Sequence, residues 1–175
     1  MTSDIHLDAI DLRLLDLLQL DASLSNLTLA ERARISPATA MRRVRRLVDT
    51  GVIERQVALL NPAKLGRGLQ ALLEVTLDRQ GAEHLDAFEA RAVADGALQQ
   101  VWRVSPGPDF VLVLWVADMP AYQLLVQRLL TQDANVRNVR AYFSVKRAKF
   151  EPRFDLQALA GLPASRPPPS ATPGP

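Results

Sequence analysis

The sequence of 175 residues contains no cysteine and only two histidines, His6 and His84. The absence of cysteine excludes disulfides, thiolate zinc sites and a cysteine nucleophile. Two separated histidines leave little with which to build a histidine-based metal or catalytic cluster, and His84, which stands beside acidic neighbours, is interpreted as a solvated surface residue. We therefore expect no metal ion and no cofactor.

Long apolar runs are also missing. The longest, such as 110–117, is far too short to cross a bilayer, so no membrane partner is expected. The N-terminus has no basic start followed by an apolar stretch, so we predict no secretory signal. With 48% hydrophobic and 23% charged residues, the composition is that of an ordinary globular chain with one or two small domains.

Charge is nearly balanced overall, at a formal +2, but it is unevenly placed along the chain. Residues 4–21 contain five aspartates against one arginine, Arg13. Residues 30–55 contain seven arginines against three carboxylates. An acidic segment followed by a basic one indicates a surface that binds an anion on one side only.

Two short helices are predicted in the first 35 residues. An apolar stripe at helical spacing favours a helix over 8–20, with Asp8 capping its start. The pattern Thr28-Leu-Ala-Glu31 is typical of a capping box, in which the threonine side chain accepts from an amide three residues later. It predicts that the second helix starts with Thr28 as its N-cap.

A third helix is predicted from Ser36 as N-cap and Pro37 as first helical residue to a stop at Gly51. On a helical wheel, one face is apolar and packs on the first two helices. The opposite face carries small residues and arginines. Three short helices with tight turns indicate a tri-helical unit of about 50 residues.

The outward face of the third helix has a composition typical of a helix that binds in the DNA major groove. A major groove admits one α-helix, and small residues near its N-terminus allow close approach to the bases. Arg42 is predicted to reach guanine O6 and N7, and Arg45 and Arg46 to contact phosphates. The stem of Arg43 is expected to pack while its head reaches solvent. The alternative is an ordinary solvated arginine face. The predicted DNA-contacting residues are Ser36, Ala38, Thr39, Met41, Arg42, Arg43, Arg45 and Arg46.

The hydrophobic period changes after residue 51. Residues 52–60 are predicted to be extended, and Asn61-Pro62 marks a linker. Four β-rich runs and two helical patterns then alternate as βαββαβ, which predicts a ferredoxin-like domain with an antiparallel sheet and two helices on one face. The expected strands are 69–77, 98–104, 110–117 and 136–145, and the expected helices are 82–93 and 121–130.

The predicted fold class is therefore α+β, an N-terminal helix-turn-helix domain followed by a ferredoxin-like domain. The expected boundaries are 1–51 for the first domain, 52–68 for a strand linker and 69–152 for the second domain. Residues 153–175 form a proline-rich tail, because six of the twelve prolines fall within 163–175, and this tail is expected to be disordered.

Four motifs, in this order and spacing, resemble the Lrp/AsnC transcriptional regulators. They are the opening LDxID (7–11), SPxTxxRRVRRL (36–47), GVI (51–53) and ALLNPxxLG (58–66). The resemblance runs without large gaps to about Phe154. It implies a winged helix-turn-helix, joined by a strand linker that pairs with its copy in a partner subunit, and a βαββαβ domain that dimerises and often assembles further into octamers.

The resemblance further implies a cytoplasmic, non-enzymatic regulator that binds double-stranded DNA and senses a small effector, usually an amino acid. Proline at 106 and 108 departs from the family's ligand loop and removes two backbone donors there. Arg34 and Asn135 stand where the family often has glycine in turns. The effector-contacting positions implied are Ser105, Gly107, Asp109, Asp118 and Asn135.

Two other functions remain open. Sirohaem decarboxylases resemble the same two-domain plan, although they use histidine and arginine around a tetrapyrrole, and no histidine lies in the predicted sheet. The chain could also be a metabolite-sensing assembly that does not bind DNA.

Overall fold

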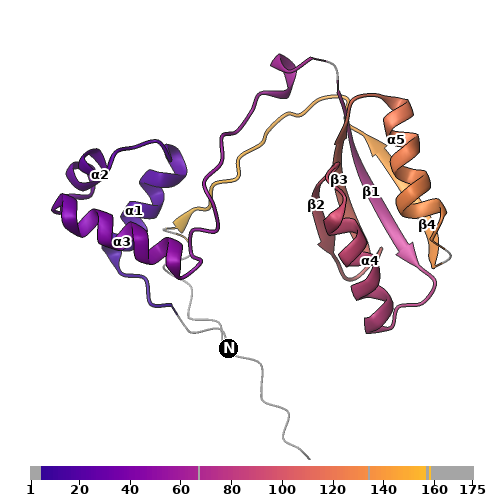
Figure 1. Ribbon diagram of the computed structural model, residues 1–175, viewed down its shortest axis with the longest axis horizontal. Coiled ribbons are helices and arrows are strands. Elements are labelled where there is room, and N and C mark those ends of the chain that lie inside the picture. Colours follow the sequence, from indigo (N-terminus) through magenta and orange to yellow (C-terminus); the bar gives the residue numbers. More distant parts are fainter. Residues whose placement is uncertain (1–4, 67, 134, 157, 159–175) are drawn as a thin grey trace, which may run out of the picture. The chain divides into compact units, whose positions relative to one another are not determined.

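The computed structural model describes residues 5–66, 68–133, 135–156 and 158, and it divides into two compact units. Of the described residues, 5–59 with 151–156 and 158 form the helical unit, and 60–66, 68–133 and 135–150 form the sheet unit. Most of the tail predicted for 153–175 lies outside the described residues. The chain therefore leaves the helical unit once, builds the sheet unit, and returns (Figure 1).

The helical unit has the three expected helices, α1 (Ala9–Leu20), α2 (Asn26–Ala33) and α3 (Pro37–Asp49). Each contributes apolar residues to one core, so the amphipathic stripes read from the sequence are confirmed. The core is small, which suits a unit of this length. Its buried members are Leu14, Leu29, Ala30, Ala33 and Ala40.

Side chains cap the start of each of these helices. Asp8 forms a capping box with α1, and Ser36 Oγ accepts from the Thr39 amide at 3.2 Å in α3, as predicted. The predicted start of α2 is wrong. Ser25 is the N-cap, and its Oγ accepts from the Thr28 amide, so Thr28 already lies in the first turn. Ser25 lies three residues before Thr28, which is the spacing at which an N-cap side chain accepts from a backbone amide. The helix can therefore start before Thr28.

The turn from α2 to α3 places Arg34 in the left-handed region, at φ 57° and ψ 49°. The arginine thus occupies a conformation that glycine adopts without strain. The cost for a side chain there is on the order of 1 kcal/mol. Gly51, at φ 75°, follows the end of α3 and has no such cost.

The sheet unit has the predicted βαββαβ order. Its strands pair antiparallel in the order β2-β3-β1-β4, the ferredoxin-like arrangement. One turn of π-helix over Gln127–Thr131 continues α5, and the last strand stops two residues earlier than expected. The elements are β1 (Leu69–Leu77), α4 (Ala82–Ala94), β2 (Leu98–Arg103), β3 (Phe110–Val116), α5 (Met119–Val126) and β4 (Val136–Phe143).

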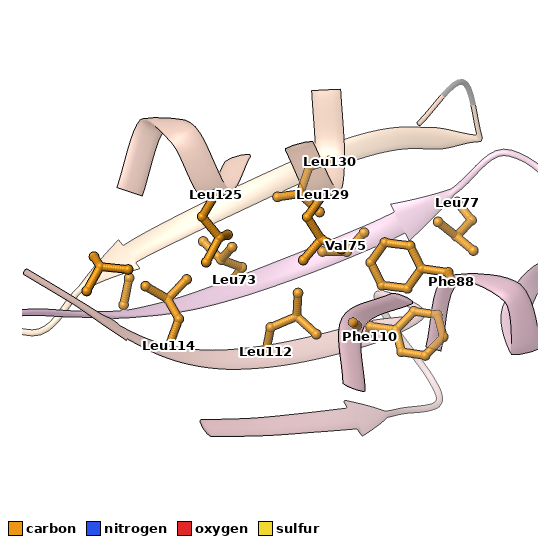
Figure 2. Close-up of a cluster of buried hydrophobic side chains, with 13 residues drawn as sticks. Leu73, Val75, Leu77, Phe88, Phe110, Leu112, Leu114, Leu125, Leu129 and Leu130 are labelled. Atoms are coloured by element: carbon orange, nitrogen blue, oxygen red, sulfur yellow. The ribbon is translucent and has the colours of Figure 1, made fainter. Parts of the chain in front are cut away.

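One face of the sheet is covered by α4 and α5. Alternate residues of β1 and β3 are buried there, as the period of two requires. Figure 2 shows Leu125 and Leu129 lying over Leu73 and Val75. At the other end of this core the rings of Phe88 and Phe110 lie 4.8 Å apart between centroids.

The opposite side, here called the open face, has no helix over it among the described residues. Leu72 is 43% exposed and Trp102 is 56% exposed, although the strands pair them with apolar partners. This face is formed by the residues that alternate with the buried ones along each strand. Its apolar members are Leu72, Trp102, Val111, Val113, Trp115 and Tyr142.

The linker after α3 forms no ladder with another strand in the described part of this chain. A short 3-10 turn, Pro62–Lys64, is capped by the Asn61 side chain. Val57 and Leu59 of the linker are exposed. The segment predicted to be extended over 52–60 begins with a bend at 52–53, where the Ile53 amide donates to the Leu47 carbonyl at 2.9 Å.

Candidate nucleic-acid interface

The exposed face of α3, here called the arginine face, comprises Ala38, Met41, Arg42 and Arg45. These positions recur at i, i+3, i+4 and i+7, so they share one side of the helix. The Arg45 side chain is 82% exposed and its Nε lies 3.8 Å from Asp49, a loose surface pair. Arg42 is exposed and makes no ion pair within the described residues. Both guanidinium groups are free to approach an anion.

Arg43 and Arg46 lie differently from this prediction. Arg43 Nη1 donates to Asp8 Oδ2 at 2.7 Å and to Asp11 Oδ1 at 2.9 Å, and its side chain is only 19% exposed. The expectation that its head reaches solvent is wrong. Arg46 Nη2 donates to Asp11 Oδ2 at 2.5 Å while 41% of its side chain stays exposed. The two acidic residues of the LDxID motif thus hold two of the four arginines.

This cluster perturbs the ionisation of its members. The Asp11 amide, followed by the Arg43 guanidinium, donates to the Asp8 carboxylate and lowers the pKa of Asp8 to about 2. Burial opposes ionisation of Asp11, but hydrogen bonds from the Asp8 amide and from both arginines outweigh it and lower its pKa. Asp8 and Asp11 raise the pKa of Arg43. The cluster joins α1 to α3 through ion pairs.

The start of α3 is also ordered. Ser36 Oγ and Thr39 Oγ1 lie 2.8 Å apart and hydrogen-bond to each other. Both side chains therefore take part in the cap, and Ser36 remains exposed. The arginine face begins one residue later than the helix, so its small residue, Ala38, lies in the first turn, where a groove-bound helix approaches the bases most closely.

Two predicted effector positions lie at the C-terminal end of β1. Asp109 Oδ2 accepts from the Leu77 amide at 2.7 Å and from Gln80 Nε2 at 3.3 Å. Asn135 Oδ1 accepts from the Arg79 amide at 2.9 Å, and Asn135 Nδ2 donates to the Arg79 carbonyl at 3.2 Å. Each polar side chain ties its loop to the end of β1.

Asn135 is not in the left-handed region, since Arg34 is the one non-glycine residue with positive φ among those described. Its side chain, not its backbone, explains asparagine at this position, because one amide both accepts from and donates to a neighbouring residue. Gly107, at φ 124°, does need to be glycine. It lies with the exposed Ser105 in the loop that leads to Asp109.

Asp118 lies at the opposite end of the sheet from these positions. It caps α5, accepting from the Ala121 amide at 2.9 Å, directly after β3. The end of β3 pairs Val116 with Leu69 at the beginning of β1. The nine residues of β1 span about 27 Å, so Asp118 and Asp109 lie far apart within one chain.

A hollow of about 470 Å³ at the start of β1 was not foreseen from the sequence. It is lined by the linker, by Trp115 and by the residues after β4, including Lys146 and Arg147. A Cβ on Gly68 would lie 2.0 Å from Trp115 Cζ2, so the backbone at this glycine rests on the indole. No spacing signal connects residues 68, 115 and 146, because only the sheet register brings them together.

No group of three or more metal-ligating side chains occurs among the described residues. In the same residues, no helix has the length and apolar character to cross a bilayer.

A three-helix unit with exposed arginines on its third helix, followed by a βαββαβ unit, defines a helix-turn-helix DNA-binding protein with an appended α/β domain. The chain matches two protein families, Winged helix-turn-helix DNA-binding over residues 7–54 and Lrp/AsnC ligand binding domain over residues 70–154.

Named relatives agree with this class. The Leucine-responsive regulatory protein of Rhizobium meliloti (strain 1021) is 38% identical over 149 residues, covering 85% of this chain and 96% of the relative. The Leucine-responsive regulatory protein of Salmonella typhimurium is 35% identical over 151 residues, covering 86% and 92%. The chain belongs to the Lrp/AsnC family and is a DNA-binding transcriptional regulator with a ligand-binding domain.

Solved structures have the same architecture. A transcriptional regulator from Neisseria meningitidis, solved as a complex with L-Met, is 28% identical and superposes with a TM-score of 0.79, covering 88% of this chain and 99% of that one. An AsnC family regulator from Agrobacterium tumefaciens is 25% identical with a TM-score of 0.79, covering 87% and 99%. The fold and family predicted from the sequence are confirmed.

Proposed function

We propose that the arginine face reads DNA with Arg42 on base edges and Arg45 on phosphates. The observation that carries this assignment is the division of the four arginines of α3. Arg42 and Arg45 are exposed, whereas Asp8 and Asp11 hold Arg43 and Arg46. Arg46 keeps partial exposure and remains a secondary phosphate contact, and Arg43 acts by fixing α3 on α1.

Ala38 and Met41 complete the reading surface. A small side chain in the first turn permits close approach, and apolar groups contact a thymine methyl. Ser36 and Thr39 contribute through the cap, which orients the first-turn amides toward a phosphate. The eight positions predicted from the sequence thus divide into readers, phosphate contacts and positioning residues.

The second domain is proposed to bind a small metabolite, an amino acid or a related molecule. Support comes from the family to which residues 70–154 belong and from the L-Met complex of the Neisseria regulator. Asp109 and Asn135 would form one part of such a site at the end of β1, together with Ser105 and Gly107. Because Asp118 lies at the other end of the sheet, a site that uses it must include a second subunit.

We also propose a homodimer formed through the open face. Leu72, Trp102 and Tyr142 are exposed at 43%, 56% and 51% on an otherwise well-packed domain. Contiguous apolar surface of this kind marks an interaction site. A symmetric dimer would present two arginine faces to a palindromic operator, which doubles the contacts of one small reader. A higher assembly of dimers, such as an octamer, is a further proposal that rests on the family to which the chain belongs.

The relatives are named as regulators, and we propose that this chain likewise has no enzymatic activity and acts in the cytoplasm. The sirohaem decarboxylase alternative finds no support from side chains, because His84 lies on α4 beside Glu83, 3.6 Å away, and not in the sheet. A spectral titration with sirohaem tests that alternative directly.

The DNA assignment is tested by binding of the full chain to a duplex selected from a random library. Arg42→Ala should lower affinity for the preferred duplex by about 1–3 kcal/mol and relax the choice at one position. Arg45→Ala should weaken all duplexes alike and reduce the salt slope by about 0.9. Arg137→Ala, at a 70% exposed arginine of the sheet unit, is the matched control. The proposal fails if Arg42→Ala behaves as Arg137→Ala does.

A further inference from the structure

A second basic element lies outside α3. After β4, the chain runs back toward the helical unit through a stretch without regular structure, here called the basic return segment (residues 144–153). It contains four cationic side chains against one carboxylate, Glu151. Its cations are Lys146, Arg147, Lys149 and Arg153.

These cations differ from several arginines that lie in ion pairs. Arg43, Arg91, Arg103 and Arg128 are each held by at least one carboxylate. Within the described residues, the four cations of the basic return segment form no ion pair, and all are exposed. Arg147 lies with its guanidinium carbon 5.2 Å from the centroid of the Phe150 ring. The segment therefore carries three more positive charges than negative ones, although Arg153 lines a hollow together with Asp16, Glu151 and Asp155.

The segment is anchored on the helical unit at its C-terminal end. Gln19 Oε1 of α1 accepts from the Phe154 amide at 2.7 Å, and Gln19 Nε2 donates to the Phe154 carbonyl at 3.2 Å. One side-chain amide thus pairs with both backbone groups of a residue 135 positions away. Asp16 and Leu20 of α1 line a hollow with the same stretch of chain.

Chain length limits how far the cations lie from the Phe154 anchor. Lys146 precedes Phe154 by eight residues, so it lies at most about 29 Å from that residue. One turn of B-DNA measures about 34 Å, and its backbone carries one charge per 1.7 Å of axis. The backbone of a duplex bound by the helical unit extends over a comparable length, which is the basis for expecting phosphate contacts from this segment.

We propose that the basic return segment is a second DNA-binding element that contacts the phosphate backbone flanking the groove read by α3. The inference rests on the proposed DNA-reading function of the arginine face. It adds a sequence-independent contact that is held in place by the Gln19–Phe154 pair. Such contacts raise affinity and salt dependence for every duplex and leave base choice to Arg42.

The direct test is the salt dependence of binding by the full-length triple variant Lys146→Gln/Lys149→Gln/Arg153→Gln. Its log–log salt slope should be shallower than that of the wild type by about 0.9 for each cation that contacts a phosphate, up to about 2.7 per chain. Between 50 and 200 mM salt, the full effect means that wild-type affinity falls about 40-fold more than that of the variant. Arg137→Gln in the sheet unit should leave the slope unchanged.

The anchor is tested without removing charge. Gln19→Ala removes both hydrogen bonds to Phe154 and should also reduce the slope, whereas Gln99→Ala, at an exposed position of the sheet unit, should not. Far-UV circular dichroism and the retained preference for the selected duplex show that the variants are folded.

The outcomes separate the two proposals. If the wild type binds no duplex at low ionic strength, the DNA-reading proposal itself fails. If the wild type binds and Arg42→Ala relaxes its choice, but the triple variant keeps the wild-type slope, only the second DNA-binding element is overturned. A triple variant with a reduced slope and a Gln19→Ala variant without one would overturn the anchoring role.

Discussion

Asp11 Oδ1 accepts a hydrogen bond from Arg43 Nη1 at 2.9 Å, and this pair joins the acidic helix α1 to the basic helix α3. The Asp11 side chain is 1% exposed, so its charge is compensated by protein groups and not by water. The same carboxylate also accepts from Arg46. Part of the acidic segment therefore neutralises part of the basic segment within the protein itself.

Asp11→Asn should destabilise the helical unit by about 2–3 kcal/mol, because it removes the charge that balances a largely buried guanidinium. Far-UV circular dichroism during urea unfolding measures the loss. Asp49→Asn is the matched control on α3, since its carboxylate is 66% exposed and only loosely paired, and it should change the free energy of unfolding by less than about 0.5 kcal/mol. Equal effects of the two changes would contradict the stabilising role of the ion pairs that Asp11 forms with α3.

The helical unit should lose stability as the pH falls from about 4 toward 2. The pKa of Asp8 is about 2 in the folded state, below its ordinary value of 3.8, so its ionised form stabilises the fold above pH 4 and this stabilisation is lost as the pH falls toward 2. Asp8→Asn should flatten this dependence in helix-monitored unfolding. Trp102 and Trp115 both lie in the sheet unit, so tryptophan fluorescence reports a transition that Asp8→Asn should leave unchanged. A wild-type helical signal independent of pH from 4 to 2 would be inconsistent with the cluster.

Gly68→Ala should destabilise the sheet unit by about 1–3 kcal/mol, because the new methyl group would overlap the Trp115 indole at 2.0 Å. In a Trp102→Phe background, the emission of Trp115 should shift as the ring moves. Gly96→Ala is the control, since nothing lies within 4 Å of a Cβ at that glycine. Unchanged emission in the Gly68 variant would show that the linker does not rest on this ring.

Leu72→Glu should dissociate the proposed homodimer, because it places a charge at the centre of the open face, opposite Val113 and Tyr142 in the adjacent strands. Sedimentation equilibrium of the full chain should show a dimer dissociation constant raised at least tenfold, the equivalent of about 1.4 kcal/mol. Leu124→Glu, at a 62% exposed leucine on α5, should leave the dimer intact. A dimer that survives Leu72→Glu would assign the interface to another surface.

Secondary structure and fold followed largely from local patterns. The strand predicted over 69–77 was found with the same bounds, because its alternation of buried residues is a period-two signal that tertiary packing only reinforced. The same is true of the Ser36-Pro37 start of α3. The start of α2 was misjudged because Ser25 and Thr28 both carry capping side chains, and local sequence does not rank two such starts.

The sequence alone therefore determined the family, the element order and the helix that carries the arginines, since each depends on spacing along the chain. Only the tertiary structure decided which arginines are free. Arg43 and Arg46 differ from Arg42 and Arg45 because α1 places Asp8 and Asp11 against one side of α3, and these contacts join residues more than 30 positions apart. Hydrogen bonds between distant segments, like that between Gln19 and Phe154, depend on packing in three dimensions and leave no periodic trace in the sequence.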